Sequence, residues 1–371
     1  MTFDLILLGF GNVARRFVTL VHERRRALAR DHGFDVRVVS VITRRHGAIH
    51  DIDGLNARAL AASVAGGGTL GVAGAAPIAE LRKALAAGRR AAREGRLVVI
   101  ETTTLDVERG EPATTHVRTA LAAGAHVVTA NKGPAAFAWK TLDRRAARAG
   151  RRFLFEGAVM DGVPVFALVR ETLPAVTITG IRGVVNTTTN FILSAMEQGQ
   201  AFEAALAEMQ RAGIAEADPT LDVDGWDAAA KTAALANVLL GAGITARDVD
   251  RTGIRGITAE RIRKALAAGA RVKLVASAAR TAEGVAASVR PVDLPERDLL
   301  AQLGPDENAI VLATDLLGEM AVVQRGSGLV QTAYALLADL TTIARGPHEG
   351  RRRPAPRSAR RDRTRGRRDR R

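Results

Sequence analysis

The chain has 371 residues, 47% of them hydrophobic, which is enough to bury a sizeable core and favours two domains over one. The absence of cysteine excludes disulfide bonds, thiolate metal sites and a cysteine nucleophile, and it is typical of a cytoplasmic protein. No apolar run approaches the roughly 18 residues of a membrane span. The N-terminus also lacks a basic leader, so we expect neither a membrane anchor nor a signal peptide.

Most of the net charge of +15 lies at the C-terminal end. Residues 351–371 contain 12 Arg and 2 Asp, a net charge of +10, which leaves +5 on the other 350 residues. Because this segment has no aliphatic side chain larger than that of Ala, it cannot offset the entropy of ordering, and we expect residues 347–371 to form a disordered tail. Nonspecific binding through the tail is the only contact with nucleic acid that the charge predicts.

The first predicted elements favour a dinucleotide site. Residues 3–8 form an apolar run typical of a buried parallel strand, and the pattern G-x-G-x-x-A at residues 9–14 leads into a helix predicted to end near Arg30. The first glycine permits a tight turn, the second lets a pyrophosphate approach the helix N-terminus, and Ala14 lets helix and strand pack closely. A tight turn without a ligand is the alternative. We assign cofactor contacts to Gly9, Gly11, Asn12 and Val13.

The second predicted strand, residues 36–42, leads into Arg44 and Arg45 and not into an acidic residue. An acid at this position would bond the ribose 2′-hydroxyl of NAD, whereas arginine accommodates the 2′-phosphate of NADP. The sequence therefore favours NADP, with NAD as the second choice. The alternative is that both arginines are ordinary surface charges.

The rest of the first half alternates strands and helices. Polar residues follow two predicted strands, at the edge where ligands bind in open α/β sheets: Thr102 and Thr103 after one strand, and Lys132 after the other. We predict a doubly wound parallel sheet, a Rossmann domain, over residues 1–155. The predicted helices span residues 55–65, 77–94, 112–123 and 135–149, and the predicted strands span residues 97–100, 126–129 and 153–155.

A second, α+β domain is predicted over residues 156–325. An antiparallel sheet with helices on one face fits the order of its elements. A last helix, about residues 329–343, lies in a final segment of residues 326–346. The second domain has strand patterns at residues 176–185, 271–279, 285–292, 308–314 and 319–324, and helix patterns at residues 190–199, 202–212, 226–240 and 258–268.

The most acidic stretch, residues 215–231, combines carboxylates with one lysine. Asp222 or Asp224 can cap a helix that begins at residues 225–227, which places Asp227 and Lys231 at positions i and i+4 on one face. A solvated acidic loop with a surface ion pair is the plain interpretation, and the missing distal Glu excludes a calcium loop. The functional interpretation is a site where carboxylates bind the ammonium group of a small amino acid and a lysine moves a proton.

Six motifs run through the chain in order: GFGNVARR at the start, TANKGP around Lys132, FEGAVMDGVPVF from Phe155, GVVNTTTNFIL from Gly183, AEADPTLDVDGWDAAAK from residue 215, and GSGLVQTAYALLADL from Gly326. Together they resemble the homoserine dehydrogenase family, over nearly the whole of residues 3–345. The resemblance implies a Rossmann domain joined to a substrate-binding and dimerisation domain, with the last helix returning to the first domain. It also implies NAD(P)-dependent interconversion of L-homoserine and L-aspartate 4-semialdehyde, in threonine and methionine biosynthesis, by a homodimer.

The resemblance assigns roles to the charged residues. Lys231 matches the proton-donating lysine and Asp227 its partner, while Lys132 matches a lysine of the cofactor and substrate cleft. Glu216 matches a carboxylate that binds the ammonium group of the substrate, and we assign Asp222 and Asp227 to substrate binding as well.

The resemblance also implies a monovalent-cation site, for an ion such as sodium, and a further cofactor contact at Gly328. The sequence departs from the family pattern in two places. Thr187 replaces a common Gly, which stiffens the loop beside the nicotinamide, and Met160 with Asp161 replaces a Gly-rich pair at the cation site. The predicted cation ligands are Glu156 and the carbonyl groups of Val159, Asp161 and Val163.

Two other functions fit parts of the sequence. A related amino-acid dehydrogenase would use the same scaffold on another substrate. A nucleotide-sensing protein that binds polyanions through the tail would show salt-dependent DNA binding without turnover.

Overall fold

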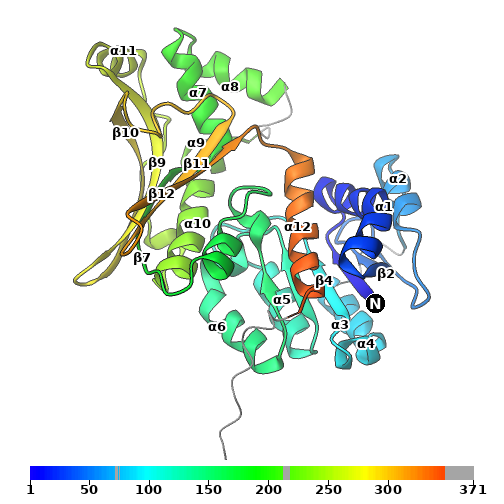
Figure 1. Cartoon of the computed structure of the whole chain (residues 1–371). Coiled ribbons are helices and arrows are strands. Elements are labelled where there is room, and N and C mark those ends of the chain that lie inside the picture. Colours follow the sequence, from blue (N-terminus) through cyan, green and yellow to red (C-terminus); the bar gives the residue numbers. More distant parts are fainter. Residues whose placement is uncertain (72–73, 75, 212–217, 347–371) are drawn as a thin grey trace, which may run out of the picture.

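The computed structural model describes residues 1–71, 74, 76–211 and 218–346, so the predicted tail and Glu216 lie outside the described residues. The described chain forms two six-stranded sheets, one mostly parallel and one mostly antiparallel. Figure 1 shows the antiparallel sheet on the left and the parallel sheet on the right, with helices between them. The predicted fold class, a doubly wound parallel sheet with a second α+β unit, is confirmed.

The first sheet has the strand order β3-β2-β1-β4-β5-β6, and all its neighbouring strands are parallel except β2 and β3. Its central strands are apolar and buried because helices cover both faces. Strand β3 was not predicted, since its three half-buried residues show no alternation. The strands are β1 (Thr2–Leu8), β2 (Asp35–Ile42), β3 (Ala48–His50), β4 (Leu97–Glu101), β5 (His126–Thr129) and β6 (Phe153–Leu154).

The helices of the first half lie close to their predicted positions. One prediction is wrong in detail, because residues 77–94 form two helices that are separated at Gly88. A Cβ atom at Gly88 would lie 2.9 Å from Leu97 Cδ2, so the break lets β4 approach the chain. The helices are α1 (Asn12–His32), α2 (Ala57–Ala65), α3 (Pro77–Ala87), α4 (Arg89–Arg93), α5 (Ala113–Ala122) and α6 (Gly133–Ala149).

The second sheet has the order β12-β11-β7-β9-β10-β8, and only β8 and β10 pair in parallel. Helices α7 and α10 pack on the side of this sheet that faces the first sheet (Figure 1). Its strands are β7 (Ile178–Val184), β8 (Asp250–Arg251), β9 (Ala270–Thr281), β10 (Gly284–Pro295), β11 (Glu307–Thr314) and β12 (Glu319–Arg325). Its helices are α7 (Thr187–Glu197), α8 (Phe202–Arg211), α9 (Thr220–Val223), α10 (Trp226–Leu235) and α11 (Ala259–Ala267).

The last helix, α12 (Leu329–Ala344), leaves the second sheet and packs against α1. Its buried residues are mostly apolar, and most of them join the core of the first sheet. Figure 1 shows α12 next to α1, although more than 300 positions separate their starting residues in the chain. The segment after β12 therefore links the two sheets a second time. The buried apolar residues on α12 are Ala333, Ala335, Leu336, Leu337, Leu340 and Ile343.

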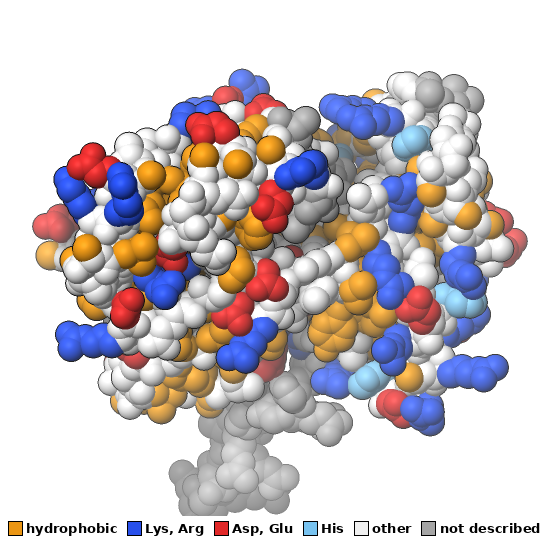
Figure 2. Space-filling view, turned by 90° about the horizontal axis from the view of Figure 1, so that it is seen from above, with side chains coloured by type: hydrophobic (Ala, Val, Ile, Leu, Met, Phe, Trp, Pro, Cys, Tyr) orange, Lys and Arg blue, Asp and Glu red, His pale blue; other side chains and the backbone are white. Residues whose placement is uncertain are grey.

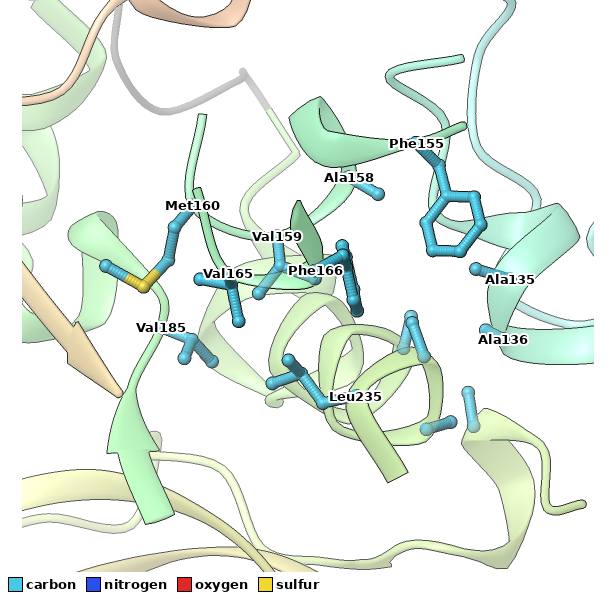
Figure 3. Close-up of a cluster of buried hydrophobic side chains, with 14 of the residues drawn as sticks. Ala135, Ala136, Phe155, Ala158, Val159, Met160, Val165, Phe166, Val185 and Leu235 are labelled. Carbon is cyan, nitrogen blue, oxygen red and sulfur yellow. The ribbon is translucent and has the colours of Figure 1, made fainter. Parts of the chain in front are cut away.

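An apolar cluster holds the two sheets together where α6 packs against α10 (Figure 3). Phe155 and Phe166 meet edge to face with ring centroids 4.9 Å apart, and Ala135 and Ala136 of α6 lie beside them. Leu235 of α10 closes the cluster on the other side. Because these side chains fix α6 relative to α10, they also fix the residues at the start of both helices.

The surface shown in Figure 2 mixes basic side chains with acidic and apolar ones on both lobes, consistent with the small net charge outside residues 351–371. Within the described ranges, every helix is too short or too polar to cross a bilayer.

His126, at the start of β5, gives the fold a testable pH dependence. Burial, reinforced by Arg151, lowers the pKa of His126 to about 4, and its Nδ1 accepts a hydrogen bond from the Arg152 N–H at 3.0 Å. The unfolded chain therefore takes up a proton near pH 6.5 while the folded chain does not. Stability from neutral His126 should be complete above about pH 6.5 and should be lost as pH falls towards 4, by about 3 kcal/mol.

The measurement is urea unfolding of the wild type and of His126→Asn between pH 7.5 and 4.5. Asn keeps an acceptor for Arg152 but cannot titrate, so the variant should lose less stability over this range. Equal losses in the two proteins would contradict the prediction.

Candidate active site

Three charged side chains from both halves of the chain meet between the two sheets. Lys132 is the N-cap residue of α6, just after β5, and Asp227 and Lys231 lie one turn apart on α10. Lys132 Nζ is 2.8 Å from Asp227 Oδ1, and Lys231 Nζ is 3.0 Å from Asp227 Oδ2. The side chains are only 15–17% exposed. The Asp227 carboxylate therefore contacts the ammonium groups of both lysines, and all three side chains are largely buried.

The burial of this cluster makes its charges depend on one another. Burial alone would raise the pKa of Asp227, but the ammonium groups of Lys132 and Lys231 outweigh it and hold that pKa well below its usual range. Burial likewise opposes the charge on Lys231, but Asp227 keeps the pKa of Lys231 above its ordinary value. Asp227 and Lys231 are therefore both ionised at neutral pH.

Two neighbours of this cluster were not assigned from the sequence. The carbonyl oxygen of Val185 accepts a hydrogen bond from Lys231 Nζ at 2.7 Å. The side-chain Nδ2 of Asn186 donates to Asp222 Oδ1 at 2.7 Å and to Asp227 Oδ2 at 2.9 Å. The N-T-T-T-N motif was the available signal for Asn186, whereas a main-chain carbonyl such as that of Val185 has none.

Asp222 lies beside the cluster and does not cap the helix, so the capping prediction for Asp222 and Asp224 is wrong. The N-cap residue of α10 is Gly225, whose φ of 80° turns the chain sharply out of the short helix α9. Asp224 instead accepts a hydrogen bond from Arg255 Nε at 2.9 Å. Burial, with the neighbouring charge of Asp227, raises the pKa of Asp222. Asp222 faces the site, where its Oδ1 accepts the hydrogen bond from Asn186.

The glycine loop between β1 and α1 has the geometry of a phosphate site. Gly9 has a φ of 82°, and a Cβ atom there would lie 2.6 Å from the carbonyl oxygen of Thr102, so only glycine fits. Gly11 is the N-cap residue of α1, and a Cβ atom there would meet no atom within 4 Å. Helix α1 has no capping side chain and no acid in its first turn, so its first N–H groups, which include those of Asn12 and Val13, are open to an anion.

The other predicted cofactor residues lie at the carboxyl ends of strands of the first sheet or at α12. Thr102 donates through its hydroxyl to Leu8 O at 3.2 Å, which ties β4 to the glycine loop. Thr103 follows and is half-buried. Arg44 and Arg45 are exposed just after β2, and Gly328 is the N-cap residue of α12. The assignment of these residues to the cofactor stays a prediction.

The predicted cation loop is organised by Glu156. Its carboxylate accepts backbone N–H groups from Val165, Phe166 and Ala167 at 2.5, 2.8 and 2.7 Å. Asp161 accepts hydrogen bonds from Gln324 at 3.0 Å and from Thr332 at 2.9 Å. Since three donors use most of the acceptor capacity of Glu156, a cation here would rest chiefly on the main-chain carbonyl groups of Val159, Asp161 and Val163.

Comparison with known proteins gives one consistent result. The family model described as homoserine dehydrogenase matches residues 164–341. An NAD(+)-dependent homoserine dehydrogenase from Pseudomonas canavaninivorans is 38% identical over 92% of this chain and 96% of its own length. A homoserine dehydrogenase from Methanocaldococcus jannaschii is 35% identical over 92% and 98%. The crystal structure of a homoserine dehydrogenase from Thiobacillus denitrificans, 32% identical, superposes with a TM-score of 0.76 and covers 93% of this chain and 74% of its own.

Proposed function

Because the chain belongs to the homoserine dehydrogenase family, we propose that it interconverts L-homoserine and L-aspartate 4-semialdehyde with a nicotinamide dinucleotide. The observation that carries this proposal is the contact of Lys132 and Lys231 with Asp227, made between the two sheets at the edge that also holds the glycine loop. A dehydrogenase needs a dinucleotide and a proton-transferring group at one place, and this edge provides for both.

The residues present fit the cofactor. The open space at Gly11 and the uncapped N-terminus of α1 would hold the pyrophosphate. Thr102, Thr103 and Gly328 would line the same cleft, from the end of β4 and the start of α12. When bound, the nicotinamide supplies or accepts the hydride.

The protein's own side chains handle the proton and the substrate's charge. When the semialdehyde becomes an alcohol, its oxygen gains a proton, and Lys231 is the donor that we propose. Asp227 and the Val185 carbonyl fix the direction of its ammonium group. Asp222 lies next to this cluster and would bind the ammonium group of the substrate, together with Glu216, which lies outside the described residues.

The larger organisation is also a proposal. We infer that residues 1–155 bind the cofactor, that residues 156–325 bind substrate and form a homodimer, and that residues 326–346 complete the first unit. The lack of cysteine fits the reducing cytoplasm. We further infer a sodium-like cation at the carbonyl groups of Val159, Asp161 and Val163, with Glu156 shaping the loop.

The direct test is a spectrophotometric assay of NADPH and NADH oxidation with L-aspartate 4-semialdehyde, and of the reverse reaction with L-homoserine. A panel of other semialdehydes and hydroxy amino acids separates this function from that of a related dehydrogenase. No turnover with this pair of substrates, but turnover with another, would assign the scaffold to a different reaction.

We propose that NADPH is preferred to NADH, because Arg44 and Arg45 follow β2 where an acid would select NAD. Changing both to Ala should lower kcat/KM for NADPH roughly 10- to 100-fold, the worth of hydrogen bonds to a charged group, and should leave NADH nearly unaffected. Arg148→Ala, an exposed arginine on α6, is the matched control. The relative from Pseudomonas canavaninivorans is named as NAD(+)-dependent, so a wild type that favours NADH is the result that would overturn this proposal.

A further inference from the structure

A buried carboxylate lies behind the loop that carries Lys132, and the mechanism above does not use it. Glu101 ends β4 and has no exposed surface. Its Oε1 accepts the Thr103 N–H at 3.1 Å and the Thr103 hydroxyl, and its Oε2 accepts the Thr129 hydroxyl at 2.8 Å. Both oxygens are therefore used as acceptors.

Among the described residues, neither a lysine nor an arginine forms a salt bridge with the Glu101 carboxyl group. Within the described chain, the only basic group within 4 Å of Glu101 is the ring of His116, whose Nδ1 is 3.7 Å from Oε1, too far for a hydrogen bond. Replacing both partners of a buried hydrogen bond by apolar groups of the same shape is often nearly neutral for stability. A buried carboxyl group that accepts three hydrogen bonds therefore points to a use for its acceptor oxygens.

The hydrogen bonds that Glu101 accepts connect, through Thr129, to the residues on both sides of Lys132, which are Asn131 and Gly133. Thr129 Oγ1, which donates to Glu101, accepts the Asn131 N–H at 2.9 Å. The Asn131 side chain donates to Thr103 O at 2.9 Å and accepts the Gly133 N–H at 2.8 Å. Residues 131 and 133 are thus tied to the ends of two strands, while the Lys132 side chain reaches across to Asp227.

We propose that Glu101 is a positioning residue for the dehydrogenase reaction: through Thr129 and Asn131 it fixes the backbone around Lys132, and so the Lys132 ammonium group against Asp227. This inference rests on the proposed function. The contacts start at Glu101 inside the first sheet and continue through Thr129 and the backbone around Lys132. They end at Asp227, the carboxylate that orients Lys231.

The test uses substitutions at Thr129 in the full-length protein. Thr129→Val has nearly the same shape but lacks the hydroxyl, and it should lower kcat roughly 10- to 100-fold through misplacement of Lys132. Thr129→Ser keeps the hydroxyl and should restore most of this loss. Thr341→Val, a buried threonine on α12 that bonds only its own helix, is the matched control and should leave kcat unchanged. NADPH affinity, measured by fluorescence titration, should stay within about twofold in all three variants.

A cycle with Lys132→Met tests the route of the effect. If Thr129 acts through Lys132, then Thr129→Val should change kcat far less in the Lys132→Met background than in the wild type. Should Thr129→Val fail to fold, Glu101→Gln replaces it in the cycle, since this nearly isosteric change reverses the hydrogen bond to Thr129.

Three results would overturn the inference: wild-type kcat in Thr129→Val, no rescue by Thr129→Ser, or an undiminished effect in the Lys132→Met background. They are separable from failure of the proposed function, which would appear as a wild type that does not turn over the substrate pair at all.

Discussion

Replacing Lys231 by Met is expected to lower kcat by about two to four orders of magnitude at saturating substrate, the usual worth of a positioned proton donor. The reason is geometric. The Lys231 ammonium is held by Asp227 at 3.0 Å and by the Val185 carbonyl at 2.7 Å, so one remaining N–H can point into the cleft in a fixed direction. Because the Lys231 side chain is only 16% exposed, we expect water to replace this donor poorly.

The assay measures kcat, with cofactor affinity determined separately so that loss of binding is not mistaken for loss of proton transfer. Lys264→Met is the matched control, because Lys264 forms the same i to i+4 pair with Glu260 at 2.8 Å on α11 but is 77% exposed. It should change kcat little.

Lys132 is the competitor for the same role, since its ammonium group contacts the other oxygen of Asp227. Lys132→Met should also reduce activity, but less than Lys231→Met. If Lys231→Met retains nearly full kcat while Lys132→Met loses several orders of magnitude without losing cofactor, the two roles are reversed.

The sequence predicted those parts of the fold that depend on local pattern. Buried strands such as β1 are continuous apolar runs, and the glycine loop with Ala14 marks where such a strand meets a helix. The pairing of Asp227 with Lys231 follows from helix periodicity alone, and the two side chains do form an ion pair. The family could also be predicted, because its motifs span both halves of the chain.

The sequence could not predict contacts that depend on how distant segments pack. The pair of Lys132 and Asp227 joins residues 95 positions apart. The break at Gly88 depends on the close approach of Leu97 from another element. Gly225, and not Asp222, is the N-cap residue of α10, although the local pattern favoured Asp222. The Asp222 side chain instead accepts a hydrogen bond from Asn186. Local periodicity carries no information on any of these contacts.

Asp227→Asn should show the second large effect, because Asp227 is the only acid that bridges the two lysines among the described residues. The substitution keeps the shape of the side chain but removes its charge. The two ammonium groups would then face each other without a counter-ion, and the pKa of Lys231 would lose the interaction that raises it. We expect kcat to fall by about two orders of magnitude or more, since the proton donor loses both charge and orientation.

The same substitution should destabilise the fold in a pH-dependent way. Breaking a buried ion pair from one side costs about 3 to 5 kcal/mol; because these side chains are 15–17% exposed, we expect the lower end of that range. The pKa of Asp227 is lower in the folded state than in the unfolded state, so its stabilisation is complete above about pH 4 and is lost as pH falls below that value. The gap in unfolding free energy between wild type and variant should therefore be wide at pH 7 and narrower near pH 3.

Urea unfolding at both pH values, combined with kcat, checks the two effects together. Asp224→Asn is the matched control, because Asp224 lies just before the same helix and pairs with a largely exposed Arg255, a surface contact worth less than about 1 kcal/mol. Asp227→Asn with wild-type kcat would show that the lysines do not need this carboxylate. Wild-type stability at pH 7 would show that the cluster is more hydrated than its burial indicates.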